Sequence, residues 1–350
     1  MNNLTYEKFG NIDITDSFFD TLKADYPEFP GWYEKKAKAG AEAFVIKEDG
    51  IQGFVYLKIE EGPIEDITPP LPDGIHLKVG TLKINGHGTK LGQRFVKKIF
   101  DTALASGVSD IYVTVYAKHS YLLDLLRTYG FQIHGEKGAG TSKELVLVKD
   151  FASWSGINLE NYPLISRESA KPHLLAIYPE YHTEFLPDSK LYNESYDVVK
   201  DVSHANSIHK IYISGIAATG KLLPGDMLVM YRTTDKKGPA KYRSVATSIG
   251  VVEEVRKIGS FPTEADFLSY VQPYSVYAES VLKNLYATSK RHIAIKFTYN
   301  IALSKRLIRD RLINEVGIST LCRWDFLRLT KNQFSQIVSL GEVNERYFID

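Results

Sequence analysis

A glycine-rich turn in the first half of the chain has residue types and spacing that suit anion binding. The turn spans residues 85–92 (NGHGTKLG), follows an alternating apolar segment at 75–84, and leads into an amphipathic segment at 93–107. A helix that starts after such a turn exposes unpaired backbone N–H groups, and its dipole adds partial positive charge. The glycines and cations of this turn are Gly88, Lys90, Gly92 and Arg94. Glycine lets the backbone approach an anion closely, so the turn predicts a phosphate or pyrophosphate site.

The same pattern also has a plain structural interpretation. Glycine turns before helices are common punctuation in α/β proteins and often bind nothing. The residues do not form a Walker loop, because no Gly-Lys-Ser or Gly-Lys-Thr is present, and they do not form a GxGxxG fingerprint. The interpretation of the turn therefore depends on the elements around it.

Those elements are expected to form a mixed α/β domain at residues 1–150. Two segments with helical spacing, near 15–26 and 31–41, precede a hairpin in which Asp49-Gly50 joins two β-rich runs. The expected order is helix, helix, hairpin, strand, helix, strand, helix, strand, strand. Such an order is typical of a mixed sheet with helices on its faces.

Two segments of this domain resemble the GNAT family of N-acetyltransferases. In that family a strand leads into Arg/Gln-x-x-Gly-x-Gly/Ala, which opens the helix that holds the pyrophosphate of acetyl-CoA. His87, Lys90 and Gly92 occupy the matching positions here. A strand and a helix ending in Gly130-Phe131 follow at the family's spacing. The resemblance covers this whole domain and implies an α+β fold with a mixed central sheet.

The resemblance also implies acetyl-CoA as a cosubstrate. Its pyrophosphate would lie on the turn at 87–95 and its pantetheine along the strand at 77–84. The acceptor amine would enter at the splay between the strands at 75–84 and 110–117. Cofactor-binding residues implied in this way are Leu82, Ile84, His87, Gly88, Lys90, Leu91, Gly92, Gln93, Arg94 and His119, the last in place of the family's usual Asn.

The catalytic positions depart from the family. The Tyr that often protonates the departing thiolate falls at Leu126, so Tyr129 and Tyr121 are the candidates for that role. The strand before the turn lacks the family's Glu, which leaves His76 as the candidate base beside Lys78. Acyl transfer needs a neutral amine and a stabilised thiolate. We therefore expect a GNAT-type N-acyltransferase, with a non-catalytic, CoA-binding domain as the alternative.

The remaining chain predicts a connector at 151–190, irregular and rich in Tyr, Pro and His, and a second domain at 191–350. Short strands at its spacing are typical of a small barrel or strongly curved sheet. A Leu-x-Pro-Gly-Asp turn at 222–226 and a glycine-containing strand at 247–255 resemble the PUA-like superfamily of PUA, ASCH and EVE modules. The resemblance implies a small β-barrel with helices that binds RNA or modified bases. The helices expected there are at 263–272, 275–287 and 304–315, the last after a strand at 292–300.

Basic residues of the second domain suit contact with RNA phosphates. The candidates are Lys236, Lys241, Arg243, Arg306 and Arg309. Tyr231, Tyr242, Tyr299 and Trp324 would supply stacking faces, because looped or single-stranded RNA is bound through phosphates and aromatic platforms. Net charge is +1, with the basic excess in this half of the chain. The alternative is that the cations form a solvated face and the aromatic side chains a core.

Composition excludes other classes of protein. Cys322 is the single cysteine, which rules out an internal disulfide, suggests a reducing, cytoplasmic setting, and is expected to be buried. The histidines match no compact ligand spacing, so no metal site is expected. No apolar run approaches the roughly 18–20 residues that span a bilayer, and the N-terminus shows no signal-peptide pattern, so no membrane association is expected.

Together these patterns predict a cytoplasmic N-acetyltransferase whose C-terminal domain presents the acceptor. The expected acceptor is RNA or a ribonucleoprotein such as aminoacyl-tRNA. A non-catalytic protein that binds RNA or a modified base is one alternative, and an acetyltransferase whose second domain docks a protein substrate is another. Some GNAT proteins that acetylate aminoacyl-tRNA are toxins, so an antitoxin or another protein is included among the expected partners.

Overall fold

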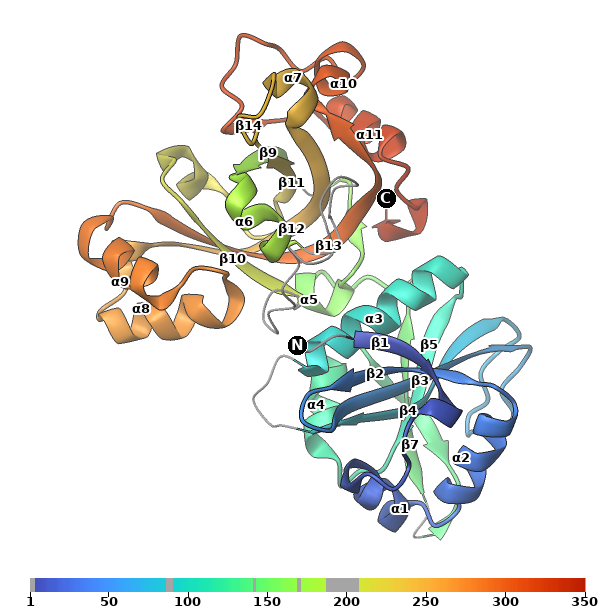
Figure 1. Cartoon of the computed structure of the whole chain (residues 1–350). Helices are drawn as coiled ribbons and strands as arrows, with labels where there is room; N and C mark the ends of the chain where they lie inside the picture. The colour runs from blue at the N-terminus through green and yellow to red at the C-terminus, as the bar shows by residue number, and fades with distance from the viewer. Residues whose placement is uncertain (1–3, 86–90, 141–142, 169–170, 187–207, 350) are drawn as a thin grey trace. The chain divides into compact units, whose positions relative to one another are not determined.

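The computed structural model divides the chain into two compact units, residues 1–160 and 161–350. It describes residues 4–85, 91–140, 143–168, 171–186 and 208–349. Each unit is built on its own mixed sheet with helices packed against it (Figure 1). The expected α+β fold class is confirmed. Within the described residues, no helix is long and apolar enough to cross a membrane.

The first unit contains a seven-stranded sheet in the order β1-β2-β3-β4-β5-β7-β6. Its strands are β1 (Leu4–Lys8), β2 (Glu42–Lys47), β3 (Ile51–Glu61), β4 (Ile75–Ile84), β5 (Asp110–Val115), β6 (Gln132–Lys137) and β7 (Glu144–Asp150). Neighbours are antiparallel except β4 and β5, which run parallel. The expected hairpin at Asp49-Gly50 joins β2 and β3. Both residues have positive φ, and with Glu48 they form the three-residue connection between the paired residues Lys47 and Ile51.

Helices cover both faces of this sheet. They are α1 (Asp20–Asp25), α2 (Phe29–Lys38), α3 (Leu91–Ser106) and α4 (Ser120–Thr128). Phe54 of β3 packs in a cluster with residues of α2 and the segment before α1. Its neighbour Gly53 points to the other face, where a Cβ would overlap the ring of Phe95 on α3. Hence α3 lies opposite α1 and α2, and a side chain at residue 53 would separate α3 from the sheet.

Close packing against Glu160 and a buried lysine surrounds the glycine at the end of α4. Gly130 follows this helix with a φ of +82°, and an added Cβ would overlap the Glu160 carbonyl oxygen. Lys149 of β7 donates its Nζ–H to the same carbonyl. Burial lowers the pKa of Lys149 to about 8, although the carboxylates of Glu160 and Asp150 oppose the shift. The Gly130-Phe131 motif is thus explained by close packing.

The second unit contains a six-stranded sheet in the order β10-β13-β12-β11-β9-β14. Its strands are β9 (Pro172–Ile177), β10 (His209–Ser214), β11 (Met227–Arg232), β12 (Val245–Lys257), β13 (Ile293–Ile308) and β14 (Phe326–Arg328). Three register shifts between β12 and β13 bend these long strands. Among the described residues β10 and β14 are unpaired edges. The sheet is therefore strongly curved and does not close into the expected barrel.

Residues 158–168 and 171–185 are more regular than the sequence indicated. They contain α5 (Asn158–Asn161), β8 (Ile165–Ser166), β9 and α6 (Pro179–Phe185). β8 pairs with β15 (Phe348–Ile349), and β9 lies between β11 and β14. The Tyr, Pro and His content suggested an irregular connector, but Pro172 only begins the strand, where its missing N–H costs little.

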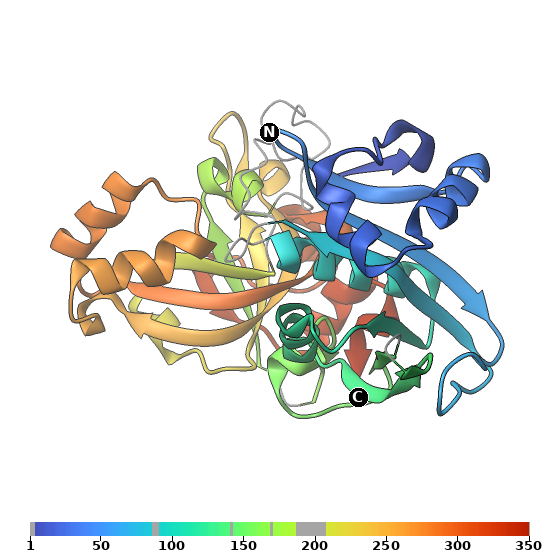
Figure 2. The same cartoon turned by 90° about the horizontal axis from the view of Figure 1, so that it is seen from below.

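Helices of the second unit are α7 (Ala240–Arg243), α8 (Glu264–Val271), α9 (Glu279–Thr288), α10 (Arg309–Asn314) and α11 (Lys331–Leu340). The helices expected at 263–272 and 275–287 are confirmed as α8 and α9, drawn in orange in Figure 2. The helix expected at 304–315 is wrong for its first half, because β13 continues to Ile308. Leu307 is buried there and pairs with Ala246 of β12, so sheet pairing outweighs local helix propensity.

Replacement of Lys149 by Met should increase stability at neutral pH. The folded chain releases the Lys149 proton near pH 8, whereas the unfolded chain holds it to about 10.5. Below pH 8 the native state therefore carries a charge whose burial costs about 3 kcal/mol. Because Met also loses the bond to Glu160, we expect Lys149→Met to raise the free energy of unfolding by about 1–3 kcal/mol at pH 7.

Urea unfolding of both proteins at pH 7 and pH 10 measures this effect. The free energy of unfolding of the wild type rises as the pH is raised from about 8 to 10.5, because the unfolded state binds more protons than the folded state in this range. The advantage of Lys149→Met should therefore shrink toward pH 10. A stability advantage of Lys149→Met that is equal at both pH values would contradict the lowered pKa of Lys149.

Candidate functional site

The parallel strands β4 and β5 separate partway along their length. They pair from His76 to Val79 and from Asp110 to Val113, and β4 then continues to Ile84 with β3 alone. A bulge at Gly80 accompanies the separation, because Leu57 pairs with Val79 and Tyr56 with Thr81. Within the described residues no strand covers the other side of β4 at residues 80–84. We call this gap the β4–β5 opening.

Unpaired backbone groups inside a sheet can bind a ligand. An extended molecule with amide groups can hydrogen-bond along an uncovered strand as an added strand does. A backbone N–H aimed at a carbonyl oxygen also stabilises negative charge that develops on it. The β4–β5 opening therefore suits an extended amide-containing ligand whose reactive carbonyl lies near the bulge.

The first turn of α3 adjoins the end of β4. Leu82 and Ile84 lie on the uncovered stretch of β4, and α3 begins at Leu91. A Cβ on Gly92 would lie 2.8 Å from Leu125 Cδ2 on α4 and 3.8 Å from Ile84 Cδ1. Gly92 therefore has a packing role whether or not a ligand binds. His87, Gly88 and Lys90 lie outside the described residues.

Two polar side chains of that turn reach into the protein. Arg94 is 4% exposed, and the Oε1 atom of the half-buried Gln93 is buried without a hydrogen-bond partner among the described residues. An unsatisfied buried acceptor is costly unless a donor reaches it, so Gln93 identifies this turn as a place where a further polar group fits.

His119 connects α4 to α1. It precedes the first residue of α4, and its Nε2 lies 3.1 Å from Asp25 Oδ2. Lys118 contacts the same carboxylate. In this structure His119 is engaged with a protein carboxylate at the end of α1, and its role toward a cofactor stays a prediction.

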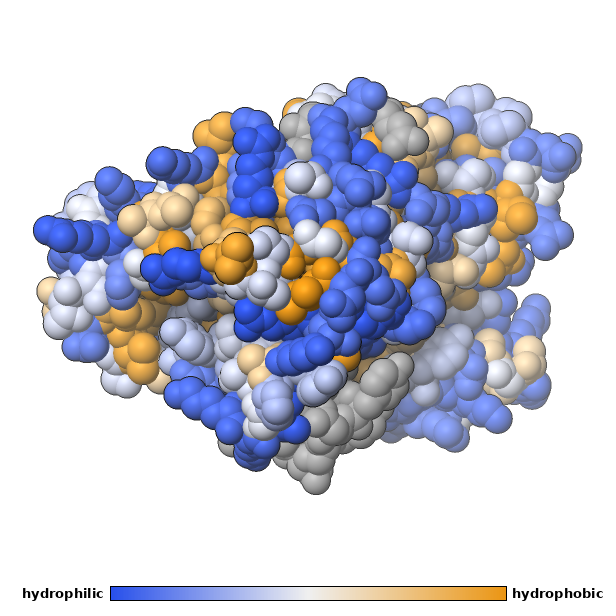
Figure 3. Space-filling model, turned by 90° about the horizontal axis from the view of Figure 1, so that it is seen from above, coloured by the Kyte–Doolittle hydropathy of each residue, from blue (hydrophilic) through white to orange (hydrophobic). Residues whose placement is uncertain are grey.

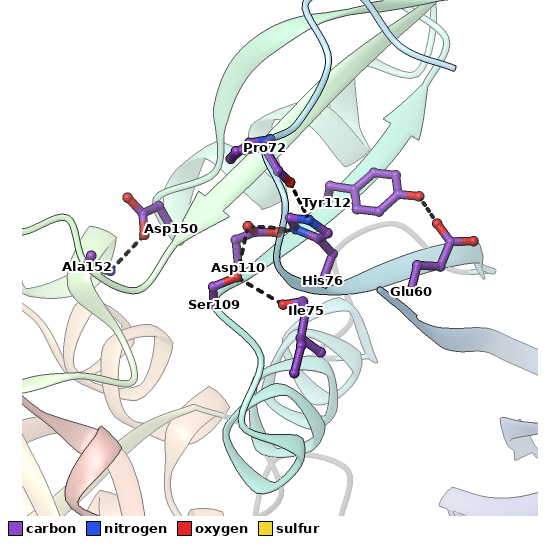
Figure 4. Close-up of polar contacts among 9 residues, drawn as sticks. All are labelled: Glu60, Pro72, Ile75, His76, Ser109, Asp110, Tyr112, Asp150 and Ala152. Carbon is purple, nitrogen blue, oxygen red and sulfur yellow. Dashed lines mark hydrogen bonds and ion pairs between the residues drawn. The ribbon is translucent and has the colours of Figure 1, made fainter. Parts of the chain in front are cut away.

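His76, the candidate base, is held on both sides (Figure 4). It is fully buried; Nδ1 lies 2.9 Å from both carboxylate oxygens of Asp110, and Nε2 lies 3.1 Å from the Pro72 carbonyl oxygen. Both ring nitrogens therefore face acceptors, and neither is free to take a proton from an amine. The geometry favours a structural role, in which His76 fastens the loop at 62–74 to the sheet.

The two tyrosine candidates occupy different environments. Tyr129 follows α4 and is 1% exposed, whereas Tyr121 is 61% exposed on the surface of that helix. Leu126, the position where the family has Tyr, is completely buried. No described hydrogen bond or ion pair joins Tyr129, Tyr121 and His76 to one another, so an acid–base set made of these three stays a prediction.

The strand register places a carboxylate, Glu60, beside the paired part of β4, and the local sequence pattern did not reveal it. Glu60 of β3 lies opposite His76 on the same face. It accepts hydrogen bonds from Tyr112 and from Lys58 at 2.7 Å, and Lys78 lies 3.9 Å away. Burial raises the pKa of Glu60, but these hydrogen bonds and the Lys78 charge outweigh it, so the pKa lies below its ordinary value. Glu60 is thus a bound anion and a poor base.

A second carboxylate lies near the free end of β5. Tyr26 and Tyr116 stack with ring centroids 4.9 Å apart, and Tyr26 donates its O–H to Glu144 at 2.9 Å. Burial and the Glu144 charge raise the pKa of Tyr26 strongly, so its proton stays in place. The contact joins residues 118 positions apart, which is why local patterns could not reveal it.

The second unit contains a cavity of about 770 Å³, which we call the aromatic cavity. Its aromatic lining consists of Tyr178, Tyr181, Tyr212, Tyr231, Tyr277 and Trp324. The guanidinium of Arg309 lies 4.5 Å above the Trp324 ring, an arrangement that stabilises the cation. Figure 3 looks onto this unit and shows hydrophobic side chains among hydrophilic ones. The aromatic side chains that line the cavity suit a ligand with flat or apolar groups.

Several of the cations predicted to contact RNA have partners within the protein. Arg243 forms two hydrogen bonds to Asp235, and Lys241 lies 3.0 Å from Asp310. Lys236 lies on an exposed turn and Arg309 lines the aromatic cavity. Arg306 is half-buried on β13. RNA contact by these residues stays a prediction.

The environments of Cys322 and His182 can be compared with what the sequence predicted for them. Cys322 is exposed, which corrects the expected burial, and it donates its S–H to the Ser319 carbonyl at 2.9 Å. His182 is buried with its pKa lowered to about 3 by desolvation, so it is a neutral core residue. Among the described residues no three His, Cys, Asp or Glu side chains are grouped to hold a metal.

Comparisons with known proteins give matches to solved structures alone, since no protein-family description and no curated sequence matches the chain. An ASCH structure from Zymomonas mobilis is 12% identical and covers 49% of this chain and 95% of its own, with a TM-score of 0.32. IAA acetyltransferase from Bacillus cereus is 15% identical and covers 42% of this chain and 99% of its own, with a TM-score of 0.30. A putative acetyltransferase from Salmonella typhimurium, solved with acetyl-CoA, is 13% identical and covers 44% of this chain and 96% of its own, with a TM-score of 0.29.

Replacement of His76 by Leu should destabilise the protein. The variant leaves the Asp110 carboxylate and the Pro72 carbonyl without their buried donor, so the free energy of unfolding should fall by about 2–4 kcal/mol. His134→Leu is the matched control, because His134 bonds the Pro69 carbonyl of the same loop from an exposed position, and its loss should cost under about 1 kcal/mol. Equal losses in urea unfolding would refute the structural role of His76.

Proposed function

We propose that the first unit binds acetyl-CoA and transfers its acetyl group to an amine. The β4–β5 opening is the observation that carries this proposal. It combines an uncovered strand, a bulge and an adjoining helix start in one place. The general resemblance to N-acetyltransferases supports the same reaction, and the second unit would present the acceptor.

Each part of the opening has a task in this proposal. The N–H groups of the first α3 turn, with Lys90 and Arg94, bind the diphosphate. The uncovered β4 backbone at residues 80–84 binds the amide-containing arm and directs the thioester carbonyl toward the bulge. Acetyl-CoA would supply the activated acetyl group: the amine nitrogen bonds to the acetyl carbonyl carbon, the C–S bond breaks, and CoA leaves as a thiol after taking a proton from solvent. A backbone N–H near Gly80 stabilises the carbonyl oxygen as negative charge develops on it.

The acceptor approaches from the face that carries α1 and α2, since α3 covers the other face. Tyr56 and Thr81 share that face, and Tyr26 and Glu144 lie on the same side beyond the end of β5. Because both ring nitrogens of His76 face acceptors, the amine proton is lost to solvent that enters there. Glu144 is the carboxylate that orients this water or the incoming ammonium.

A CoA titration tests the cofactor site directly. Addition of CoA to isotope-labelled protein should shift the backbone amide resonances of Leu91, Gly92 and Gln93. Lys90→Glu should weaken the CoA Kd at least tenfold, because it places a negative charge beside the diphosphate. Lys35→Glu, the same charge change at an exposed site on α2, should leave the Kd unchanged. Unperturbed amides at millimolar CoA would refute the site.

Catalysis is tested separately from binding. Acetyl-CoA and a panel of primary amines are incubated with wild-type protein, and acetylated products are measured by mass spectrometry. Product formation that Lys90→Glu reduces at subsaturating acetyl-CoA supports the enzyme. CoA binding without any product would instead favour a ligand-sensing domain that has lost catalysis.

A further inference from the structure

The sheet register brings three polar residues together in the aromatic cavity. Arg232, Val245 and Ile308 pair in a row across β11, β12 and β13. One chain neighbour of each member of this row lines the cavity, and these neighbours, which we call the polar cluster, are Tyr231, Ser244 and Arg309. The backbone N–H of Arg309 donates to the Ser244 carbonyl at 2.8 Å, which holds these two residues side by side. The ends of three neighbouring strands thus position the polar cluster.

The hydroxyl of Tyr231 has no hydrogen-bond partner within the described residues. Tyr231 is 2% exposed, although it lines the cavity. Burial raises the pKa of Tyr231, and the nearby Ser244 and Arg309 side chains oppose the shift, yet neither meets hydrogen-bond geometry with the hydroxyl. A buried hydroxyl left unsatisfied is costly. Tyr231 therefore indicates that a further polar group fits beside the polar cluster.

Arg309 supplies positive charge at the same place. Its guanidinium lies 4.5 Å above the Trp324 ring, which supports one flat face of the cation and leaves the N–H groups in its plane for other partners. The neighbouring Asp310 and the cavity residue Asp325 each form an ion pair with a different cation. In the part of the chain that the structure describes, no carboxylate pairs with Arg309. The polar cluster therefore suits an anionic group.

The wall of the cavity favours a flat ring. Tyr181 and Tyr277 lie with ring centroids 5.0 Å apart, and Tyr178 is 62% exposed beside them in the lining. Aromatic rings pack well against such surfaces. Aromatic linings also bind quaternary ammonium ions, but the charge of Arg309 in the same cavity repels a cation. The combination of wall and polar cluster thus selects a ring that carries negative charge.

A carboxylate matches the polar cluster better than a phosphate does. One guanidinium and a tyrosine hydroxyl supply donors for the two oxygens of a carboxylate. A nucleic-acid strand needs several cations, and three others around the cavity are already engaged in ion pairs: Lys241, Arg243 and Arg323. The cavity volume of about 770 Å³ is in the range of small-molecule sites.

We infer that the aromatic cavity binds a small aromatic carboxylate. The carboxylate accepts hydrogen bonds from Arg309 and from the Tyr231 hydroxyl, and the ring packs against the aromatic side chains of the wall. This inference does not depend on acyl transfer, because the binding is measured without acetyl-CoA.

Calorimetric titration of the full chain with matched probes tests the chemical class. The probes are benzoate, naphthalene-2-carboxylate and biphenyl-4-carboxylate, each with its carboxamide, and acetate. At least one aromatic acid should bind about tenfold more tightly than its carboxamide, which lacks the charge, and than acetate, which lacks the ring. Absence of binding by all three acids at millimolar concentration, or equal affinity of acid and carboxamide, would overturn the inference.

Replacement of Arg309 by Gln tests the charge. Arg309→Gln should weaken binding of the best acid about tenfold, whereas the Kd of the carboxamide should change less than about threefold, which also shows that the cavity is still folded. Arg291→Gln is the matched control, because Arg291 is exposed and lies outside the cavity lining, and it should bind the acid as wild type does. Equal losses for acid and carboxamide would refute the role of Arg309.

Replacement of Tyr231 by Phe tests the unsatisfied hydroxyl. Tyr231→Phe should weaken binding of the acid about fivefold. The urea midpoint of the free protein should not fall, because no hydrogen bond to the described residues is lost. A lower midpoint with unchanged affinity would show that the hydroxyl serves the fold and would overturn its assignment to the ligand. Tighter binding of uridine 5′-monophosphate than of any acid would show a nucleotide site instead.

Discussion

The short parallel pairing of β4 and β5 is the constraint on which the first unit depends. Four paired positions hold the two halves of the sheet together, and the bulge at Gly80 then turns β4 away from β5. If the pairing continued to Ile84, the backbone would be satisfied and no opening would exist. The sheet therefore lacks interstrand hydrogen bonds at residues 80–84 of β4, where the proposed ligand would supply them.

How much of this the sequence could predict follows from the range of the interactions. Asp49-Gly50, the strand at 75–84 and the helix after it are set by local residue preferences, and all three are present in the structure. The partners of His76 and Tyr26 lie 34 and 118 residues away, so their engagement was invisible to local patterns. The extension of β13 through Leu307 was missed for the same reason, since burial against β12 decides it.

In the candidate site, too, local elements were predictable from the sequence and contacts between distant residues were not. The strand at 75–84 and the helix after it were correctly anticipated, whereas the assignment of proton transfer to His76, Tyr129 and Tyr121 stays a prediction. The sequence did not single out Glu60 of β3 and Glu144 of β7. Each accepts a hydrogen bond from a tyrosine hydroxyl, Glu60 from Tyr112 and Glu144 from Tyr26. The pKa of Glu60 lies below its ordinary value, so this carboxylate shapes the electrostatics of its surroundings more than it exchanges protons.

Cys322 has a practical consequence that follows from its location. It is the single cysteine of the sequence, it is exposed, and it lines the aromatic cavity beside Arg323 and Trp324. A thiol-reactive dye would thus label one defined position in the wall of that cavity without any engineering of the chain. Its emission would report when the space is filled, so the natural protein already carries an attachment point for an optical sensor.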